Sequence, residues 1–198
     1  MAIPAFALFG PPGCGKGTQA EMIKERMGFL HVSTGDIFRN AIARQDPQAM
    51  EAQEIMQRGE LVPDELIRDL LAKELEQLFK DNPDAKGLIL DGFPRTVSQA
   101  ELLNDLLEQF KLNFKGILAM EVDEEELVKR LLNRAKEQGR SDDTEDVIRE
   151  RMRVYQEKTQ PLEDYYKQKN LYTAVEGVGA LEEVYNRLSP IIEQWTKE

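Results

Sequence analysis

The segment Gly10-Pro-Pro-Gly-Cys-Gly-Lys-Gly-Thr18 constrains this 198-residue chain more than any other feature of its sequence. It follows a short apolar run, residues 5–9, and precedes a stretch of helical character, residues 19–27. Glycines let backbone N–H groups converge on an anion, and the positive end of the following helix adds to the attraction. Lys16 supplies a mobile positive charge for the outer phosphates of a nucleotide. The segment therefore predicts a phosphate-binding loop between a buried strand and a helix.

The same glycines also fit a dinucleotide-binding turn, because Gly15-x-Gly17-x-x-Ala20 matches G-x-G-x-x-A. That pattern gives no role to Lys16, and no acidic residue ends a second strand at the required distance. The phosphate loop itself departs from the common pattern at Gly17, where a Ser or Thr usually contacts the metal ion. Thr18 is the nearest hydroxyl, so we expect the metal ion to be held largely by water and phosphate.

Five apolar runs recur along the chain, each too short for a helix and without strict alternation. Such runs are typical of strands that are covered on both faces, as in a parallel sheet. Amphipathic stretches lie between the runs, so the order predicts a doubly wound α/β fold. The predicted strands cover residues 5–9, 29–32, 88–90, 117–122 and 171–175.

Two segments interrupt this alternation. Residues 33–62 hold two helical patterns with no strand between them, and residues 134–144 are polar and contain Gly139. Insertions of this kind on an α/β core are candidates for moving parts. The other predicted helices cover residues 63–78, 96–110, 124–136, 144–169 and 181–195.

Charge and cysteine content exclude several classes of protein. The chain has 26 basic and 37 acidic residues, a net charge of −11, which argues against a general nucleic-acid binder. The single cysteine, Cys14, excludes an internal disulfide framework and a multi-cysteine zinc site. The apolar start is short and has no basic residue before Lys16, so it predicts neither a secretory signal nor a membrane span. We expect a cytoplasmic protein without membrane or nucleic-acid partners.

A second group of chemically useful residues follows the third apolar run, in Leu90-Asp-Gly-Phe-Pro-Arg95. An acid that ends a buried strand beside a phosphate loop is placed to hold Mg²⁺ or its waters. The guanidinium of Arg95 is a bidentate ligand for phosphate. Base-reading Asn-Lys-x-Asp motifs of GTPases are absent from the sequence. A regulatory nucleotide-binding module remains a different class, and it would not consume ATP in response to an acceptor.

Five motifs, in order and with their spacing, resemble the adenylate kinase family over nearly the whole chain. The resemblance implies a P-loop NTPase-type α/β fold with a five-stranded parallel sheet flanked by helices. It also implies reversible, Mg²⁺-dependent transfer of the ATP γ-phosphoryl group to AMP, giving two ADP, by a monomer. The motifs are Gly10-Pro-Pro-Gly-Cys-Gly-Lys-Gly-Thr18, Ser33-Thr-Gly-Asp36 with Arg39, Gly59-Glu-Leu-Val62, Asp91-Gly-Phe-Pro-Arg95 with Gln99, and Gly139-Arg-Ser-Asp-Asp143.

The resemblance also divides the single domain, residues 1–198, into parts. The core comprises residues 1–32, 63–133 and 145–198, the helical NMP-binding lobe residues 33–62, and the lid residues 134–144. Only five residues separate Arg134 from Arg140, so the lid is of the short type, without a structural zinc ion. We expect Mg²⁺, arriving with ATP, to be the only required metal ion.

Site residues follow from the same resemblance, motif by motif. Catalytic roles fall to Lys16, Asp91, Arg95, Arg134, Arg140 and Arg151. ATP is expected against Gly13, Cys14, Gly15, Lys16, Gly17, Thr18, Arg130, Arg134 and Gly179. AMP is expected against Thr34, Arg39, Glu60, Leu61, Val62, Gly92, Phe93, Pro94, Arg95, Gln99, Arg140 and Arg151. No residue is expected to bind Mg²⁺ directly, and its waters are placed near Asp91 and Thr18.

Base choice is expected to depend on Gln99, whose amide can accept from the adenine amino group and donate to the adjacent ring nitrogen. A UMP/CMP kinase of the same fold is the alternative. That family typically carries Asn residues after its Gly-Phe-Pro-Arg motif, where this chain has Thr96 and Gln99. It also tends to have Ala where Thr34 stands. His31 is expected to be a packed core residue rather than a catalyst.

Overall fold

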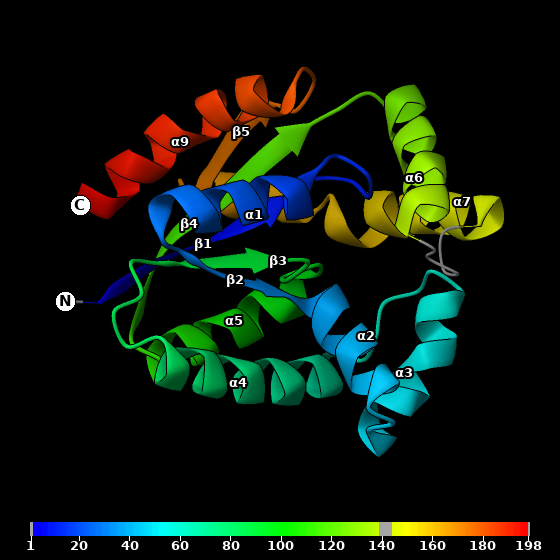
Figure 1. The fold of residues 1–198 in the computed structure, drawn as a ribbon, viewed down its shortest axis with the longest axis horizontal. Coiled ribbons are helices and arrows are strands. Elements are labelled where there is room, and N and C mark those ends of the chain that lie inside the picture. The colour runs from blue at the N-terminus through cyan, green and yellow to red at the C-terminus, as the bar shows by residue number, and fades with distance from the viewer. Residues whose placement is uncertain (1, 139–143, 198) are drawn as a thin grey trace.

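The structure of the protein is a computed structural model that describes residues 2–138 and 144–197 (Figure 1). Its centre is a five-stranded sheet in the order β2-β3-β1-β4-β5, and every neighbouring pair is parallel. All five predicted strands are present. They are β1 (Ile3–Phe9), β2 (Leu30–Ser33), β3 (Leu88–Asp91), β4 (Leu112–Glu121) and β5 (Tyr172–Glu176).

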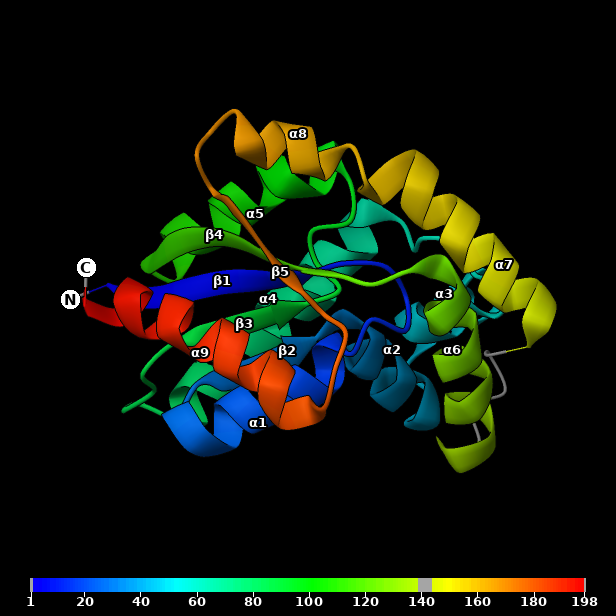
Figure 2. The same cartoon turned by 90° about the horizontal axis from the view of Figure 1, so that it is seen from above.

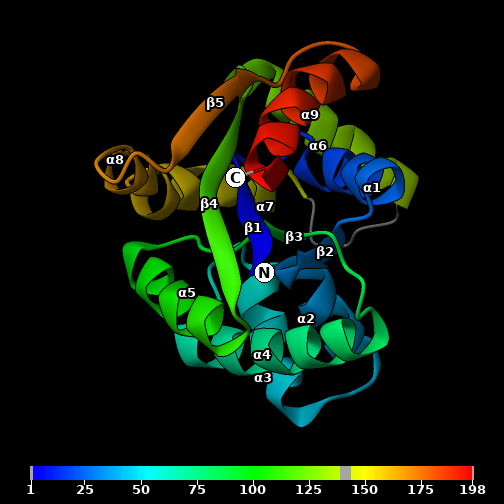
Figure 3. The same ribbon diagram turned by 90° about the vertical axis from the view of Figure 1, so that its left-hand side faces the viewer.

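Helices cover both faces of the sheet, which confirms the predicted fold class. Figure 3 shows α1 and α9 on one side and α4 and α5 on the other. The helices are α1 (Lys16–Met27), α2 (Thr34–Ala43), α3 (Pro47–Gln57), α4 (Asp64–Asp81), α5 (Val97–Gln109), α6 (Glu124–Gln138), α7 (Glu145–Val154), the π-helical turn η1 (Tyr155–Thr159), α8 (Leu162–Lys167) and α9 (Leu181–Lys197).

Strand β1 illustrates why the apolar runs are continuous. Ala5, Ala7 and Phe9 belong to the core beneath α4 and α5, whereas Phe6 and Leu8 belong to the core beneath α1 and α9. Successive side chains of a strand point to opposite faces, so a sheet with two covered faces needs apolar residues at every position. Full burial of one Leu or Phe side chain contributes about 1.5–3 kcal/mol, so each face stabilises the sheet.

Two elements differ from their predicted extents. Strand β4 begins at Leu112, five residues before the predicted start, because Asn113 and Lys115 interrupt the apolar run although the backbone there still pairs with β1. The register shifts between Ala5 and Phe6, which is a β-bulge. The single helical pattern predicted over residues 144–169 is divided into α7, η1 and α8, and Pro161, which lacks an N–H group, lies at the division.

Several helices lie together at one end of the molecule. Figures 1 and 2 show α2, α3, α6 and α7 together at the end opposite to both chain termini. Helices α2 and α3 follow β2 directly, with no strand between them. This end is also where the parallel strands finish, and ligands of open α/β sheets bind outside the carboxyl ends of the strands.

Within the two described ranges, no helix has the length and apolar character that crossing a membrane requires.

Candidate functional site

A cleft of about 880 Å³ opens at the carboxyl ends of the strands. Its walls bring together motifs that lie far apart in the sequence, from the phosphate loop to the segment between β5 and α9. Most of the predicted site residues line this cleft. They are Gly13, Cys14, Gly15, Lys16, Gly17, Thr18, Thr34, Arg39, Glu60, Leu61, Val62, Asp91, Gly92, Pro94, Arg95, Arg130, Arg151 and Gly179.

The phosphate loop turns sharply between β1 and α1 and requires its glycines. Gly10, Gly13 and Gly15 all have positive φ, between 85° and 137°. A Cβ atom on Gly10 would lie 2.6 Å from the backbone oxygen of Met120, so the loop and the end of β4 approach too closely for any side chain. The loop is thus fixed by its neighbours before any ligand binds, as a preorganised anion site requires.

Lys16 lies at the first turn of α1 and bends back over the loop. Its Nζ atom donates to the carbonyl oxygens of Gly10 at 2.8 Å and Pro11 at 3.1 Å, and lies 3.5 Å from the Sγ atom of Cys14. The side chain of Cys14 is fully buried and belongs to the core on the α1 and α9 side of the sheet, so its thiol is a packing group. The ammonium group is therefore held at the mouth of the loop, where an anionic ligand would meet it.

Asp91 ends β3 and faces the start of α1. A Cβ atom on Gly17 would lie only 3.7 Å from the Asp91 Oδ2 atom, which places this carboxylate beside the phosphate loop. Burial favours the neutral acid, but His31, Lys16 and Arg95 outweigh it, and the pKa of Asp91 is lowered. Asp91 is therefore a carboxylate at neutral pH.

His31 lies between two acids, an arrangement that sequence reasoning missed. Its Nδ1 atom is 3.0 Å from the Glu21 Oε1 atom, and its Nε2 atom is 3.5 Å from the Asp91 Oδ2 atom. Burial favours the neutral ring, yet the two carboxylates prevail and raise the pKa of His31. The side chain is 7% exposed, in agreement with the predicted packed residue, but it also lines the cleft.

The turn after β3 delivers Arg95 into the cleft. The carbonyl oxygen of Gly92 accepts from the Thr34 hydroxyl at 2.9 Å and from the Arg95 Nε atom at 2.8 Å. Gly92 has φ of 77°, and a Cβ atom there would lie 2.7 Å from Arg95 Nη2 and 2.8 Å from Thr34 Oγ1. One backbone carbonyl therefore positions two residues of the cleft wall, and only glycine fits beneath them.

Of the arginines that line the cleft, Arg39 and Arg151 lie close enough to Arg95 to repel it. Burial lowers the pKa of Arg95, Asp91 opposes this change, and the nearby guanidinium groups of Arg151 and Arg39 lower the pKa further. Such mutual repulsion marks a local excess of positive charge. Arg39 pairs with Asp36 at 2.6 Å, and a Cβ atom on Gly35 would lie 2.9 Å from the Arg39 Nη2 atom. The acidic chain thus concentrates cations in one cleft, which suits a small polyanionic ligand.

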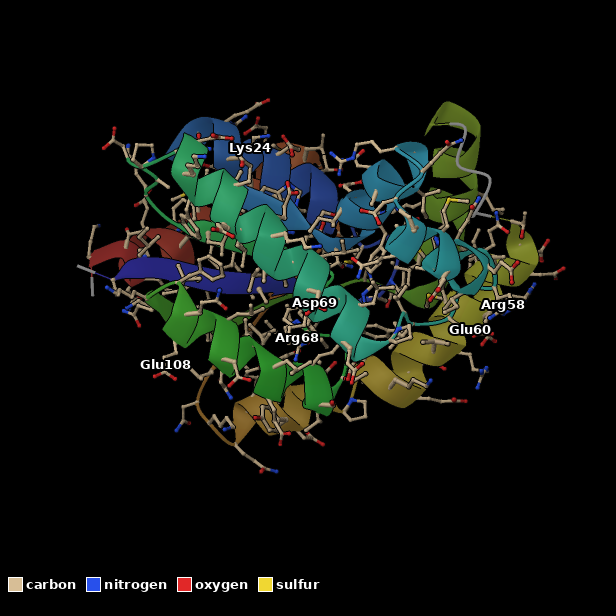
Figure 4. The ribbon with its side chains drawn as sticks, turned by 90° about the horizontal axis from the view of Figure 1, so that it is seen from below. Lys24, Arg58, Glu60, Arg68, Asp69 and Glu108 are labelled. Carbon is tan, nitrogen blue, oxygen red and sulfur yellow. The ribbon has the colours of Figure 1, made fainter. Side chains whose placement is uncertain are left out.

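Glu60 lines the cleft, and its carboxylate is paired with a neighbouring arginine. Its carboxylate accepts from Arg58 at 2.8 and 3.3 Å, and Figure 4 shows this pair at the molecular surface. The preceding Gly59 packs directly on α7, where a Cβ atom would lie 3.1 Å from the Cγ atom of Arg151. The turn after α3 and helix α7 therefore touch across the cleft.

Gln99 does not line the cleft in this structure. The side chain is fully buried, its Oε1 atom accepts from the Arg95 backbone N–H at 2.8 Å, and its Nε2 atom donates to the Asp64 Oδ1 atom at 2.8 Å. Thr96 accepts from the Gln99 backbone N–H, so Thr96-x-x-Gln99 is a variant of the capping box. This pattern is present in the sequence, and it indicates a structural role for Gln99 that we did not predict.

Several other residues complete the comparison with the predicted site. Phe93 is buried in the core rather than in the cleft wall. Arg130 lines the cleft and pairs with Glu126 at 3.0 Å. Arg134 lies within α6, but its side chain and the whole of Arg140 fall outside the described residues. Tyr155 and Thr159 of the π-helical turn also line the cleft, although neither was predicted to belong to the site, and π-helical turns are frequent at functional sites.

Metal-binding groups are sparse around the cleft. Among the residues that the structure describes, no three His, Cys, Asp or Glu side chains lie close enough together to hold a metal ion. Asp91 and Thr18 supply a carboxylate and a hydroxyl to the cleft wall. Oxygen donors of this kind suit Mg²⁺, which usually keeps several of its waters.

Comparisons with known proteins point in the same direction as this geometry. The family model described as "Adenylate kinase" matches residues 8–171. A protein named Adenylate kinase from Thermus thermophilus is 46% identical over 184 residues, which cover 93% of this chain and 94% of that protein. Proteins of the same name from Flavobacterium johnsoniae (45% over 189 residues, 95% and 97% covered) and Parabacteroides distasonis (42% over 185 residues, 93% and 95% covered) are also similar. Similarity of this extent over nearly the whole length shows that the chain belongs to the adenylate kinase family and is a phosphotransferase of the nucleoside monophosphate kinase type.

Proposed function

We propose that this cleft transfers the γ-phosphoryl group of MgATP to AMP, reversibly, and releases two molecules of ADP. The observation that carries the proposal is the meeting of Lys16 with Arg39, Arg95 and Arg151 in one cleft beside Asp91. Phosphoryl transfer depends mainly on positioning and on neutralising charge. A wall with several cations and one carboxylate supplies both.

The two nucleotides have separate places in this proposal. ATP lies with its phosphates on the loop that ends at Lys16 and Thr18, and with its base toward Arg130 and Gly179. AMP lies against the other wall, between Thr34 and Arg39 on α2 and the turn that carries Arg95. These two walls adjoin at Asp91 and Gly17, where the Cβ position of Gly17 is 3.7 Å from the carboxylate.

Mg²⁺ enters with ATP as part of the substrate. Asp91 and Thr18 are the residues that would hold its waters, and the lowered pKa of Asp91 keeps the carboxylate charged for this task. The ion supplies neutralisation of phosphate charge when it is bound. Gly17 leaves space beside Asp91, which favours contact through water rather than through a protein hydroxyl.

The proposed reaction requires no general base from the protein. An AMP phosphate oxygen is anionic at neutral pH, so it can attack the γ-phosphorus atom without losing a proton to the protein. Arg95 and Arg151 stabilise the transferring group, and Lys16 holds the β- and γ-phosphates. Water must be excluded to prevent hydrolysis, and the lobe of residues 33–62 and the lid of residues 134–144 are the parts that close. Arg134 and Arg140 would contribute from the lid.

Adenine is the proposed base on both sides, and the protein is proposed to act in the cytoplasm as a monomer. The three relatives reported above all carry the name adenylate kinase. The UMP/CMP kinase alternative is distinguished by the acceptor, and size-exclusion chromatography with light scattering distinguishes a monomer of 22.7 kDa from larger assemblies.

A coupled assay of ATP consumption with AMP, CMP or UMP as acceptor tests the proposal. We expect turnover with AMP, little without an acceptor, and none after removal of Mg²⁺ by EDTA. The Lys16→Met variant should lose activity by about a hundredfold or more, because a phosphate contact made in the transition state is gone. Lys24→Met, an exposed lysine of the same helix (Figure 4), is the matched control. Faster turnover with CMP or UMP than with AMP would contradict the assignment.

A further inference from the structure

The segment between β5 and α9 forms one edge of the cleft through Gly177, Gly179 and Leu181. The proposed function places the adenine of ATP against this segment at Gly179. Leu181 is 57% exposed and lines the cleft, so it offers an apolar surface to a flat base. Residues 177–180 belong to neither a strand nor a helix. Their position therefore depends on contacts with the rest of the molecule.

Arg187, on α9, holds this segment from behind. Its Nη1 atom donates to the carbonyl oxygens of Glu176 at 2.9 Å and Val178 at 2.6 Å. Its Nη2 atom lies 3.4 Å from the Glu176 carboxylate. One guanidinium group thus bonds the residues on both sides of Gly177. Arg187 itself is not part of the cleft lining.

Other contacts fix the two ends of the segment. The Gly177 N–H donates to the Glu121 carbonyl at 2.7 Å, at the end of β4. At the other end, the Gln19 side chain donates to the Leu181 carbonyl at 3.0 Å, and the Glu183 carboxylate accepts from the Ala180 N–H at 2.9 Å. The Arg187 contact to Val178 lies between these ends, immediately before Gly179. A loop residue with φ of 129°, such as Gly179, has wide backbone freedom unless its neighbours are held.

We propose that Arg187 is a positioning residue for the nucleoside end of ATP. It acts through the backbone of residues 176–178, and thereby sets where Gly179 and Leu181 stand relative to the base. Loss of the guanidinium group would leave two carbonyl oxygens without this donor and would let the segment take other conformations. The phosphate loop and the AMP wall would keep their geometry. This inference rests on the proposed binding of ATP adenine at Gly179.

The test compares Arg187→Met, which keeps the aliphatic stem, with Arg187→Lys, which keeps a cation able to donate to both carbonyls. Arg26→Met is the matched control. It removes an exposed arginine of α1 that bonds Glu182 on α9, the helix of Arg187, but that donates to no carbonyl of the segment. Steady-state kinetics give KM for ATP, KM for AMP, kcat, and the ratio of kcat/KM for ATP to that for GTP. Thermal unfolding of each variant accompanies the kinetics.

For Arg187→Met we expect KM for ATP to rise about tenfold, because a change of this size corresponds to the loss of one well-placed hydrogen bond to the base. The preference for ATP over GTP should fall by a similar factor, while kcat and KM for AMP stay within about twofold. Arg187→Lys should recover most of both losses, and Arg26→Met should change neither. A lower melting temperature with unchanged KM for ATP and unchanged base preference would overturn the inference. An unaltered protein that does not consume ATP on addition of AMP would instead overturn the proposed function, and the inference with it.

Discussion

The Gln99 Nε2 atom donates a 2.8 Å hydrogen bond to the Asp64 Oδ1 atom, and so joins the first turn of α5 to the first turn of α4. The second oxygen of the same carboxylate accepts from the Ser98 hydroxyl at 2.8 Å. Gln99 Oε1 accepts from the Arg95 backbone N–H. A carboxylate can only accept and a backbone N–H can only donate, so these partners define which way the Gln99 amide points. One N–H and one lone pair of the amide are not used by these bonds, although the side chain is fully buried in this structure and does not line the cleft.

Replacing Gln99 by Leu is therefore expected to weaken the choice of purine. Adenine presents an amino donor and a ring acceptor where hypoxanthine presents the reverse, and the oriented amide matches only adenine. We expect the ratio of kcat/KM for AMP to that for IMP to fall about tenfold or more. Ser98→Ala removes the other hydrogen bond to Asp64 and should leave the ratio unchanged. An unchanged ratio in Gln99→Leu would show that this amide serves the α5 cap alone.

Replacing Arg95 by Met is expected to lower kcat by about 10³-fold or more, because an arginine beside the transferring phosphoryl group acts mainly in the transition state. The matched control is Arg68→Met, whose side chain pairs with Asp69 on the exposed face of α4 (Figure 4). That control should keep kcat within about twofold. Single-turnover measurement at saturating ATP and AMP separates the chemical step from binding. A kcat loss under tenfold would argue against contact between Arg95 and the reacting group.

Stability should depend on pH through His31. Its pKa is raised in the folded protein, so the folded state binds the proton more tightly than the unfolded state does. The contribution is complete below the ordinary histidine value of about 6.5 and is lost as pH rises through the folded-state pKa. The melting temperature of the native chain minus that of His31→Gln should thus decrease from pH 6 to pH 8.5. A constant difference over this range would contradict the ion pairs with Glu21 and Asp91.

Replacing Gly87 by Ala is expected to destabilise the protein by about 1–3 kcal/mol, the cost of overpacking a core. A Cβ atom at Gly87 would overlap the ring of Phe29, which is 3% exposed and packs against Phe6 with ring centroids 5.8 Å apart. Urea unfolding gives the free energy of unfolding. The double variant Gly87→Ala with Phe29→Leu should lose less than the two single losses added together, because the smaller side chain makes room. Strict additivity would show that the new methyl group is accommodated elsewhere.

Much of the fold was predictable because its signals are local. Ala5 to Phe9 is apolar throughout, since both faces of β1 are covered, and no long-range information is needed to expect a buried strand there. The start of β4 was missed because Lys115 and Asn113 interrupt the apolar run, although backbone pairing with β1 does not depend on side-chain polarity. The division of the 144–169 helix was missed because its amphipathic pattern continues into residues whose backbone adopts the π-helical turn.

The sequence alone was sufficient for the phosphate loop, the alternation of strands and helices, and most residues of the cleft wall, because each depends on residue types at short spacing. Pairing of distant side chains was decided by tertiary structure. Asp64 and Gln99 are separated by 35 positions, and nothing local indicates that α4 and α5 begin side by side. The partners of His31 and the carbonyls held by Arg187 are further examples. A hydrogen bond forms only within about 3 Å, and packing of whole elements decides which polar groups come that close.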